Sequence, residues 1–285
     1  MSHAIEVSGL RKCYGELAAV DGVDFQVASG EIFALLGPNG AGKTTTVEIL
    51  EGYRDRDSGE VRVLNVDPQH ATAAYKSRIG IVLQSASDLA DLSVLEAVQH
   101  FASYYAAPRD PDEVITSVGL EEKRNTRGME LSGGQRRRLD VALGIIGRPE
   151  VLFLDEPTTG FDPEARRQFW VLIRSLQAEG TTILLTTHYL EEAEALADRV
   201  AVIATGRIVA IDTPANLGGR ATAQATVSWL QDGRTHSERT REPTVLVRTL
   251  LQRFEGEIPE LSVTRPSLED VYLELIEHTA LQGER

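Results

Sequence analysis

Residues 32–50 read IFALLGPNGAGKTTTVEIL, where an apolar run stops at Gly37 and apolar residues return after three threonines. Gly37, Gly42, Lys43 and Thr44 fit the spacing G-x-x-x-x-G-K-[ST]. A strand-length apolar run precedes the motif and a helical pattern follows it. In that context glycines let successive backbone N–H groups turn toward an anion at a helix N-terminus. The stretch therefore predicts a loop that binds the phosphates of a nucleotide.

We call residues 37–45 the phosphate loop. Lys43 is expected to reach the β- and γ-phosphates, and the Thr44 hydroxyl to ligate Mg²⁺. The expected nucleotide-binding residues of the loop are Gly37, Pro38, Asn39, Gly40, Ala41, Gly42, Lys43, Thr44 and Thr45. The alternative is a glycine-rich turn that carries a lysine by chance, and the strand and helix on either side disfavour it.

The composition is that of a soluble globular protein that does not itself cross a membrane. The 285 residues carry a formal net charge of -14, and an acidic surface repels phosphate backbones, so nucleic acid is not an expected partner. No apolar run approaches the roughly 20 residues that span a bilayer, and the N-terminus has no signal pattern. The single cysteine, Cys13, excludes an intramolecular disulfide and suits a reducing cytoplasm.

Strand and helix patterns alternate over most of the chain. Short alternating strands are expected in residues 4–37, helices near 93–105 and 111–118, and buried strands in VLFLDEP (151–157) and TTILLTTH (181–188). Residues 199–212 predict a hairpin that turns near Thr205 and Gly206. Strands alternating with helices predict an α/β fold with a mostly parallel sheet that is covered on both faces.

The C-terminal part differs in character from what precedes it. TPANLGG (213–219) predicts a linker, so we expect domains at 1–217 and 218–285. Asp232 and Gly233 are a hairpin-turn signal, and Ser267 with Asp270 resembles a capping box at the start of the last helix. The apolar face of that helix is expected to hold Leu268, Val271, Tyr272, Leu275 and Ile276. The part is therefore predicted to be a small α+β domain.

VLFLDEP predicts a buried strand with an acidic C-terminal end. Ligands of open α/β sheets bind at that edge, so Asp155 is expected to hold Mg²⁺ and Glu156 to act as general base on the attacking water. A strand that simply ends in solvated carboxylates is the alternative. The phosphate loop in the same chain makes a nucleoside triphosphatase the better interpretation.

LSGGQRRRLDVAL (131–143) supplies a second anion site. Ser132, Gly133 and Gly134 expose backbone at the start of a helix, where N–H groups point outward. One γ-phosphate needs only one such receptor, so we expect a dimer in which each chain's Ser132 loop caps the ATP held by the other. The alternative is a glycine-rich cap on a surface helix.

With these three motifs in order, residues 3–217 resemble the ABC-transporter ATPase family. The resemblance implies a P-loop NTPase cassette with an antiparallel β subdomain and a helical subdomain.

It also implies roles for single residues. Tyr14 matches the aromatic that stacks on adenine, and Gln135 completes the LSGGQ motif at the nucleotide. Gln84 matches the glutamine that touches Mg²⁺ and the water, Asp162 matches the aspartate that crosses the dimer interface, and His188 matches the histidine on the γ-phosphate. Phe161 replaces the leucine that is usual before the crossing aspartate.

A finer resemblance points to one branch of the family. TTHYLEEAEALADRVAVIATGRIVAIDTPANL and RPSLEDVYLELI look like the ATPase subunits of bacterial drug-resistance exporters. This implies a cytoplasmic subunit that uses ATP and Mg²⁺, dimerises, and docks on the inner face of the membrane beneath a separate permease that exports a drug-like compound. Two alternatives remain, a soluble ABC ATPase that acts as an assembly or remodelling factor and a nucleotide switch without catalysis. The presence of Glu156 and His188 argues against the switch.

The apolar residues after Gln84 are candidates for contact with the permease. We expect most of them to lie in the core and a minority to form the groove that receives the permease. They are Leu89, Leu92, Leu95, Phe101, Tyr104 and Tyr105.

Overall fold

The computed structural model describes residues 2–82, 91–254 and 256–283. Its contacts divide the chain into two compact units, Met1–Ile211 and Asp212–Arg285. Each unit is described by itself. The division lies near the end of the last strand of the first unit, slightly before the boundary at 217 that the linker pattern indicates.

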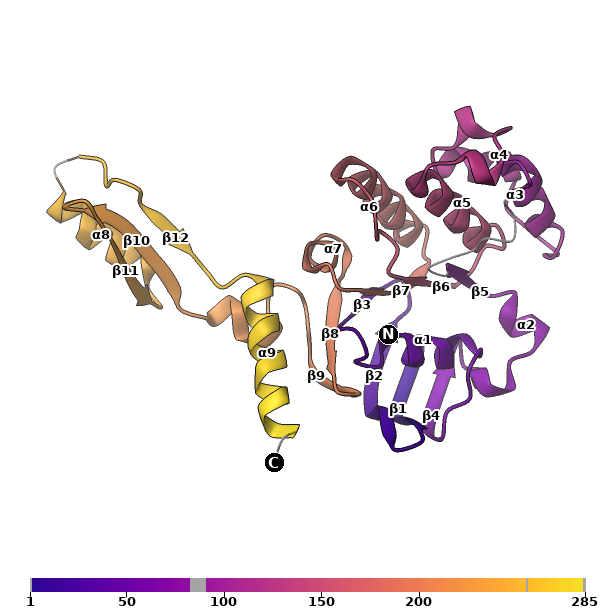
Figure 1. The fold of residues 1–285 in the computed structure, drawn as a ribbon, viewed down its shortest axis with the longest axis horizontal. Helices are drawn as coiled ribbons and strands as arrows, with labels where there is room; N and C mark the ends of the chain where they lie inside the picture. Colours follow the sequence, from indigo (N-terminus) through magenta and orange to yellow (C-terminus); the bar gives the residue numbers. More distant parts are fainter. Residues whose placement is uncertain (1, 83–90, 255, 284–285) are drawn as a thin grey trace. The chain divides into compact units, whose positions relative to one another are not determined.

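A mostly parallel sheet forms the centre of the first unit (Figure 1). Among the described residues its strand order is β5-β6-β7-β3-β8-β9. The strands are β3 (Ile32–Leu36), β5 (Ile79–Val82), β6 (Val151–Asp155), β7 (Thr182–Thr187), β8 (Arg199–Ala204) and β9 (Arg207–Asp212). The pairs within β5-β6-β7-β3-β8 are all parallel, which confirms the predicted fold class. Thr205 and Gly206 both have positive φ, as a tight hairpin turn between β8 and β9 requires.

An antiparallel sheet packs against this centre. It consists of β1 (His3–Tyr14), β2 (Leu17–Ala28) and β4 (Ser58–Val63) in the order β2-β1-β4, and β1 and β2 are longer than the short strands predicted. Its inner residues share one hydrophobic core with the main sheet, where the rings of Phe25 and Phe33 stack with centroids 5.3 Å apart. The antiparallel sheet is thereby fixed against the strand that leads into the phosphate loop.

Helices lie on both sides of the main sheet, with α1 on one side and α6 on the other (Figure 1). The helices of the first unit are α1 (Lys43–Glu51), η1 (Pro68–His70), α2 (Ala73–Lys76), α3 (Val94–Ala102), α4 (Pro111–Ser117), η2 (Glu121–Lys123), η3 (Gly128–Glu130), α5 (Gly133–Ile145), α6 (Pro163–Ala178) and α7 (Leu190–Leu196). Helices α3, α4 and α5 pack on one another and form the helical part that the resemblance implies.

The expectation for the apolar residues of the helical part was wrong in detail. Helix α3 buries Val94, Ala97 and Val98, which share one face at a period of 3.6 residues. The larger residues lie off that face: Leu92, Leu95, Phe101 and Tyr105 are partly exposed and Tyr104 is exposed. Leu89 lies outside the described residues. The helix also ends at Ala102, before the predicted end at 105.

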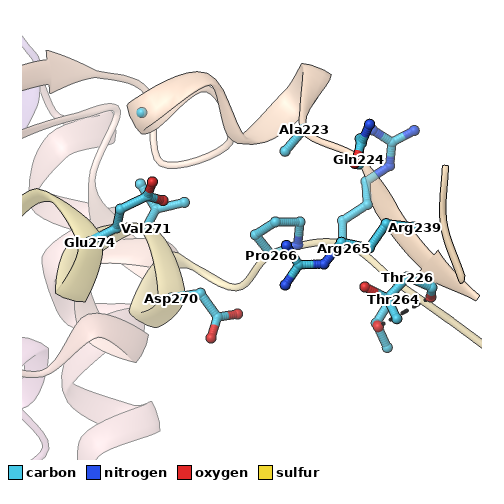
Figure 2. A pocket seen from close by; sticks show the side chains of 11 residues that line it. Ala223, Gln224, Thr226, Arg239, Thr264, Arg265, Pro266, Asp270, Val271 and Glu274 are labelled. Carbon is cyan, nitrogen blue, oxygen red and sulfur yellow. Dashed lines mark hydrogen bonds between the residues drawn. The ribbon is translucent and has the colours of Figure 1, made fainter. Parts of the chain in front are cut away.

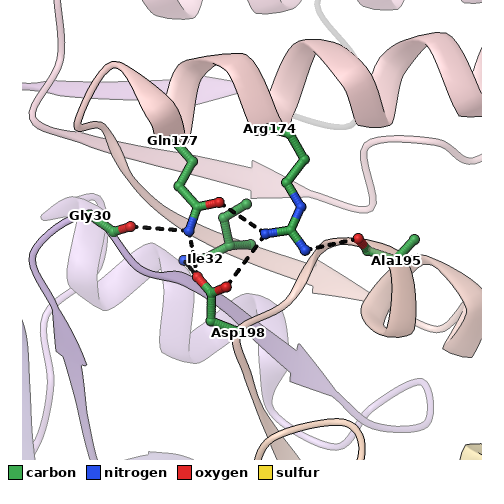
Figure 3. Close-up of polar contacts among 6 residues, drawn as sticks. All are labelled: Gly30, Ile32, Arg174, Gln177, Ala195 and Asp198. Carbon is green, nitrogen blue, oxygen red and sulfur yellow. Dashed lines mark hydrogen bonds and ion pairs between the residues drawn. The ribbon is translucent and has the colours of Figure 1, made fainter.

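A polar network fixes α6 to the start of β3 (Figure 3). The Asp198 carboxylate accepts hydrogen bonds from the Ile32 amide (2.9 Å) and from the side chains of Arg174 and Gln177 of α6. Arg174 in turn donates to the Gln177 side chain (3.0 Å). Helix α6 is therefore anchored near its C-terminus. The N-cap of the helix is Asp162, one of the predicted site residues.

The C-terminal unit is a small α+β structure. It contains η4 (Leu217–Thr222), β10 (Ala225–Gln231), β11 (Arg234–Thr240), α8 (Pro243–Arg253), β12 (Ser262–Thr264) and α9 (Leu268–Gly283), with strand order β11-β10-β12. The predicted hairpin turn is present, because Asp232 and Gly233 both have positive φ between β10 and β11. The Ser267–Asp270 capping box is also confirmed, since each side chain accepts the other residue's backbone N–H. The unit has its own core of Val227, Trp229, Leu250 and Ile258.

Candidate ATP site

The phosphate loop joins β3 to α1 and can only be built with glycine at two points. A Cβ atom on Gly37 would lie 2.4 Å from the Ile203 carbonyl oxygen. A Cβ atom on Gly42 would lie 2.3 Å from the carbonyl oxygen of Ala19 in β2, and Gly42 has a φ of 103°. The loop is thus pressed between β8 and the antiparallel sheet, while Pro38, Asn39 and Gly40 at its tip are exposed.

Lys43 begins α1 and is almost fully buried beneath the loop. Its Nζ donates hydrogen bonds to the carbonyl oxygens of Gly37 (2.8 Å) and Pro38 (3.2 Å). Burial lowers the pKa of Lys43, and the charges of Glu156 and Asp155 oppose that effect. The ammonium group is therefore held by the loop carbonyl oxygens and interacts electrostatically with the two carboxylates at the end of β6.

Asp155 and Glu156 occupy the carboxyl end of β6, as predicted, and one threonine holds both. Thr186 faces Asp155 in the adjacent strand β7, and its hydroxyl donates to the Asp155 carboxylate. The Glu156 amide donates to the hydroxyl and to the carbonyl oxygen of Thr186, both at 3.1 Å. Glu156 has a φ of 44°, a left-handed conformation that is uncommon for a residue other than glycine. No local sequence pattern marks Thr186; only the strand register reveals it.

His188 follows β7 and meets Glu156 across the strand ends. Its Nδ1 lies 3.3 Å from the Glu156 carboxylate, and the His188 side chain is 39% exposed. The structure therefore gathers Lys43, Asp155, Glu156 and His188 at the carboxyl edge of β3, β6 and β7. Ligands bind at this edge in open α/β sheets.

The donors near this edge fit a magnesium ion. Thr44 is exposed at the first turn of α1 and offers a hydroxyl, and Asp155 offers a half-buried carboxylate. Mg²⁺ prefers oxygen ligands and is usually held by one or two carboxylates together with substrate phosphates. Within the described part of the chain, no group of three His, Cys, Asp or Glu side chains is placed to hold a metal ion. Gln84, the third expected ligand, lies outside the described residues.

Tyr14 is exposed at the end of β1, on the hairpin that packs against the phosphate loop. Its ring is contacted by cations, with Arg54 Cζ 5.3 Å and Lys12 Nζ 5.9 Å from the ring centroid. Arg54 is fixed by an ion pair with Glu48 of α1 (2.6 Å). The position suits a base-stacking surface, and Arg54 is a neighbour that the sequence analysis missed.

Ser132 is the N-cap of α5 and forms a capping box with Gln135. The Ser132 hydroxyl accepts from the Gln135 amide (3.3 Å), and the Gln135 side chain accepts from the Ser132 amide (3.0 Å). The Asp162 side chain caps α6 by accepting a hydrogen bond from the Ala165 amide (2.8 Å). These segments line one hollow of about 490 Å³, made by Gly119, Ser132, Gly133, Gly134, Gln135, Arg138, Gly160, Phe161, Asp162, Glu164, Ala165 and Gln168. Among the described residues, its lining includes no part of the phosphate loop.

Another hollow, of about 470 Å³, lies within the C-terminal unit (Figure 2). It is lined by residues of η4, β10 to β12 and the start of α9, with charges of both signs. Arg265 donates to the Ala221 carbonyl oxygen (2.8 Å), and Asp270 belongs to the capping box with Ser267. At least these two charged groups therefore serve the fold of this unit.

No helix within the described residues has the length and apolar character needed to span a bilayer.

Comparison with known proteins agrees with this geometry. The family model described as ABC transporter matches residues 20–159. The daunorubicin/doxorubicin resistance ATP-binding protein DrrA of Streptomyces peucetius is 37% identical over 98% of this chain and 94% of its own length. A Nod factor export ATP-binding protein I of Ralstonia nicotianae is 46% identical over 75% of this chain and 68% of its own. The solved structure of cbiO1 from Clostridium perfringens, part of an ABC transporter complex, is 29% identical with a TM-score of 0.70, over 76% of this chain and 90% of its own. The chain therefore belongs to the ABC transporter family, as an ATP-binding subunit that hydrolyses ATP.

Proposed function

We propose that this chain couples ATP binding and hydrolysis to the export of a drug-like or lipophilic compound by a separate membrane permease. In this proposal it works as a dimer on the inner face of the membrane. The relatives named for drug resistance and for Nod factor export support an exporter, and the DrrA relative matches over the C-terminal unit as well as the first.

The two-chain proposal rests on one observation: the expected nucleotide contacts form two separate groups. The phosphate loop, Asp155 and Glu156 lie at the edge of the main sheet, while Ser132 and Asp162 line a different hollow. The N-terminus of α5 presents backbone N–H groups that suit a phosphate. A second copy of the chain would bring its Ser132 loop onto the γ-phosphate of the ATP held here. Each nucleotide would then be enclosed by two chains.

In the proposed reaction the chain's residues mainly position charge. Lys43 and the loop amides bind the phosphates, and Tyr14 stacks on the base. Glu156 accepts a proton from the attacking water, and His188, already 3.3 Å from that carboxylate, contacts the γ-phosphate.

Thr44 and Asp155 would hold Mg²⁺, with Gln84 as a further proposed ligand. When bound, the ion neutralises charge on the β- and γ-phosphate oxygens.

A groove of about 320 Å³ is the proposed contact for the permease. It is lined by Glu51, Gly52, Tyr53, Lys76, Ile79, Gly80, Ile81, Phe101, Tyr105, Leu143 and Gly144. Phe101 and Tyr105, two of the apolar residues after Gln84 that are candidates for permease contact, line this groove. The proposed occupant is a cytoplasmic segment of the permease with an apolar side, because most of the lining consists of apolar side chains, aromatic side chains and glycines.

Membrane association tests the proposal against its rival, a soluble assembly or remodelling factor. The chain with an affinity tag would be expressed at its native level in its own host, and membranes would be separated from cytosol and extracted with detergent. We expect most of the chain in the membrane extract, bound to one multi-span protein, with an ATPase rate that changes when that protein is present. Recovery entirely in the cytosol, with soluble partners only, would support the rival.

A further inference from the structure

Glu192 is a fully buried carboxylate that none of the proposed steps uses. It lies on α7, four residues after His188, and its exposed fraction is 0%. Burial raises the pKa of Glu192, and hydrogen bonding to Thr187, Thr158 and Trp170 acts in the opposite direction. A buried carboxylate is costly unless its surroundings compensate it, so a position of this kind calls for an explanation.

The compensating groups come from three different elements. Thr158 follows β6, Trp170 belongs to α6, and Thr187 ends β7. The Thr187 hydroxyl accepts the Tyr189 amide (2.9 Å), which leaves its proton to point elsewhere. In the described structure, both Glu192 oxygens, the Thr158 hydroxyl and the Trp170 indole nitrogen are shielded from solvent without a hydrogen bond of standard geometry. The carboxylate and its surrounding donors are thus buried, but the hydrogen bonds between them lack standard geometry.

The two threonines belong to two segments that carry predicted site residues. We call residues 157–162 the Thr158 loop; it follows Glu156 directly and ends at Asp162. We call residues 187–190 the His188 turn. Arg166 of α6 links the same elements, because its guanidinium lies 4.8 Å from the ring centroid of Tyr189 in the His188 turn.

The opposite side of the Thr158 loop is held by the helix that starts at Ser132. Arg137 of α5 is 7% exposed and donates to the carbonyl oxygens of Asp155 (2.7 Å) and Pro157 (3.0 Å). The charge of Glu192 is among those that oppose the effect of burial on the pKa of Arg137. The start of the Thr158 loop therefore lies between a buried cation and a buried anion.

We propose that Glu192 is a positioning residue for ATP hydrolysis. Its carboxylate interacts with hydroxyl and indole donors from three elements. These interactions hold the Thr158 loop in a fixed position relative to the His188 turn. Nucleotide that contacts His188 then tightens the cluster and shifts the Thr158 loop. The consequence for a second chain, through Asp162, rests on the two-chain arrangement proposed above.

The first test compares steady-state ATPase kinetics of full-length variants. Glu192→Ala should lower kcat by at least about tenfold with an ATP KM within about twofold of wild type, because misplacement of the loop affects chemistry more than binding. Glu192→Gln keeps the shape and an acceptor oxygen, so it should restore kcat to within about threefold. Glu60→Gln, the same change on an exposed residue of β4, is the matched control and should leave both constants unchanged. Wild-type kcat in Glu192→Ala, or equal losses in the Ala and Gln variants, would overturn the proposal.

The fluorescence emission of Trp170 distinguishes the proposed link from a general loss of stability. The chain has two tryptophans, so Trp229→Phe leaves Trp170 as the only emitter. Adding ATP with Mg²⁺ should shift Trp170 emission when Glu192 is present and should not shift it in Glu192→Ala. An unchanged shift in Glu192→Ala would contradict the proposed link.

If Glu192→Ala does not fold, Trp170→Phe takes its place. Loss of the indole N–H should lower kcat by about threefold or more at unchanged KM, and wild-type kcat would overturn the proposal. Dimerisation is measured separately by light scattering of Glu156→Gln in ATP. A failure of the two-chain arrangement would therefore be distinguished from a failure of the Glu192 link.

Discussion

At the scale of single residues, the hydrolytic centre depends on one buried hydroxyl. Thr186 is 0% exposed and connects to both predicted carboxylate residues, through the Asp155 side chain and the Glu156 amide. Glu156 has positive φ, a conformation that persists only where the surroundings hold it. The hydrogen bonds that Thr186 accepts from the Glu156 amide therefore stabilise the backbone from which the proposed general base projects.

Replacing Thr186 with valine keeps the shape of the side chain and removes the hydroxyl. We expect kcat for ATP to fall by about tenfold, which corresponds to about 1.4 kcal/mol, with little change in KM. Steady-state phosphate release checks this. Thr182→Val is a matched control at the other end of β7, where the hydroxyl accepts the Gly30 amide (3.0 Å), and it should change stability but not kcat. Equal effects of the two changes on kcat would contradict the assigned role of Thr186.

The motif residues could be predicted from the sequence, and their supports could not. Lys43, Asp155 and Glu156 stand in short local patterns, and strand ends of a parallel sheet meet at one edge. His188 is expected only from the family resemblance. Thr186 depends on the register between β6 and β7, which no local pattern states. Arg137 and Glu192 likewise contact segments far away in the sequence, and a buried charge has no signature before its surroundings are known.

At the scale of elements, α1 carries a buried ionisable side chain at each end. It begins at Lys43 under the phosphate loop and ends at Glu51, which is 6% exposed. Burial, with the charges of Asp155 and Glu48, raises the pKa of Glu51 to about 8. Between its ordinary value of 4.5 and about 8, the folded chain binds a proton that the unfolded chain has released. Glu51 should therefore make the folded state less stable as pH rises through this range.

Glu51→Gln should remove this dependence. The free energy of unfolding of the variant, relative to wild type, should increase between about pH 5 and pH 8 and level off above it, by an amount on the order of a few kcal/mol. Urea unfolding at several pH values checks this. Glu60→Gln, on an exposed residue of β4, controls for charge removal. Parallel pH profiles for the wild type and Glu51→Gln would show that Glu51 is ionised in the folded chain.

Element boundaries were predicted best where turn chemistry marks them. The Thr205–Gly206 and Asp232–Gly233 turns and the Ser267 capping box appear where the sequence placed them. The prediction that most of the large apolar side chains after Gln84 are buried was wrong, because small side chains form the packed face of α3. Helix α3 packs through Val94, Ala97 and Val98, and Tyr105 instead packs on Gly147, where a Cβ atom would lie 2.2 Å from its ring.

At the scale of the whole molecule, the described predicted site residues all lie in the first unit. In that unit the antiparallel sheet and the main sheet share a hydrophobic core, and the C-terminal unit has a separate one around Trp229. We propose that the C-terminal unit folds separately and tunes dimerisation. A chain that ends at Asp212 should then fold cooperatively and bind ATP. Circular dichroism melting and nucleotide titration check this, and an unfolded truncation would show that residues beyond Asp212 complete the main core.

The central claim is that each ATP is enclosed by two chains, and light scattering of Glu156→Gln tests it most directly. The variant keeps the shape of the side chain and lacks the base, so it should hydrolyse ATP very slowly and accumulate with ATP bound. We expect its mass to rise from the monomer value of 31.2 kDa to twice that in ATP and not in ADP, because the contact is to the γ-phosphate. Adding Ser132→Arg should abolish the dimer, since a bulky side chain at the start of α5 blocks the approach to the opposing phosphate. Equal dimerisation of the double variant, or hydrolysis by Glu156→Gln at the wild-type rate, would contradict the two-chain site.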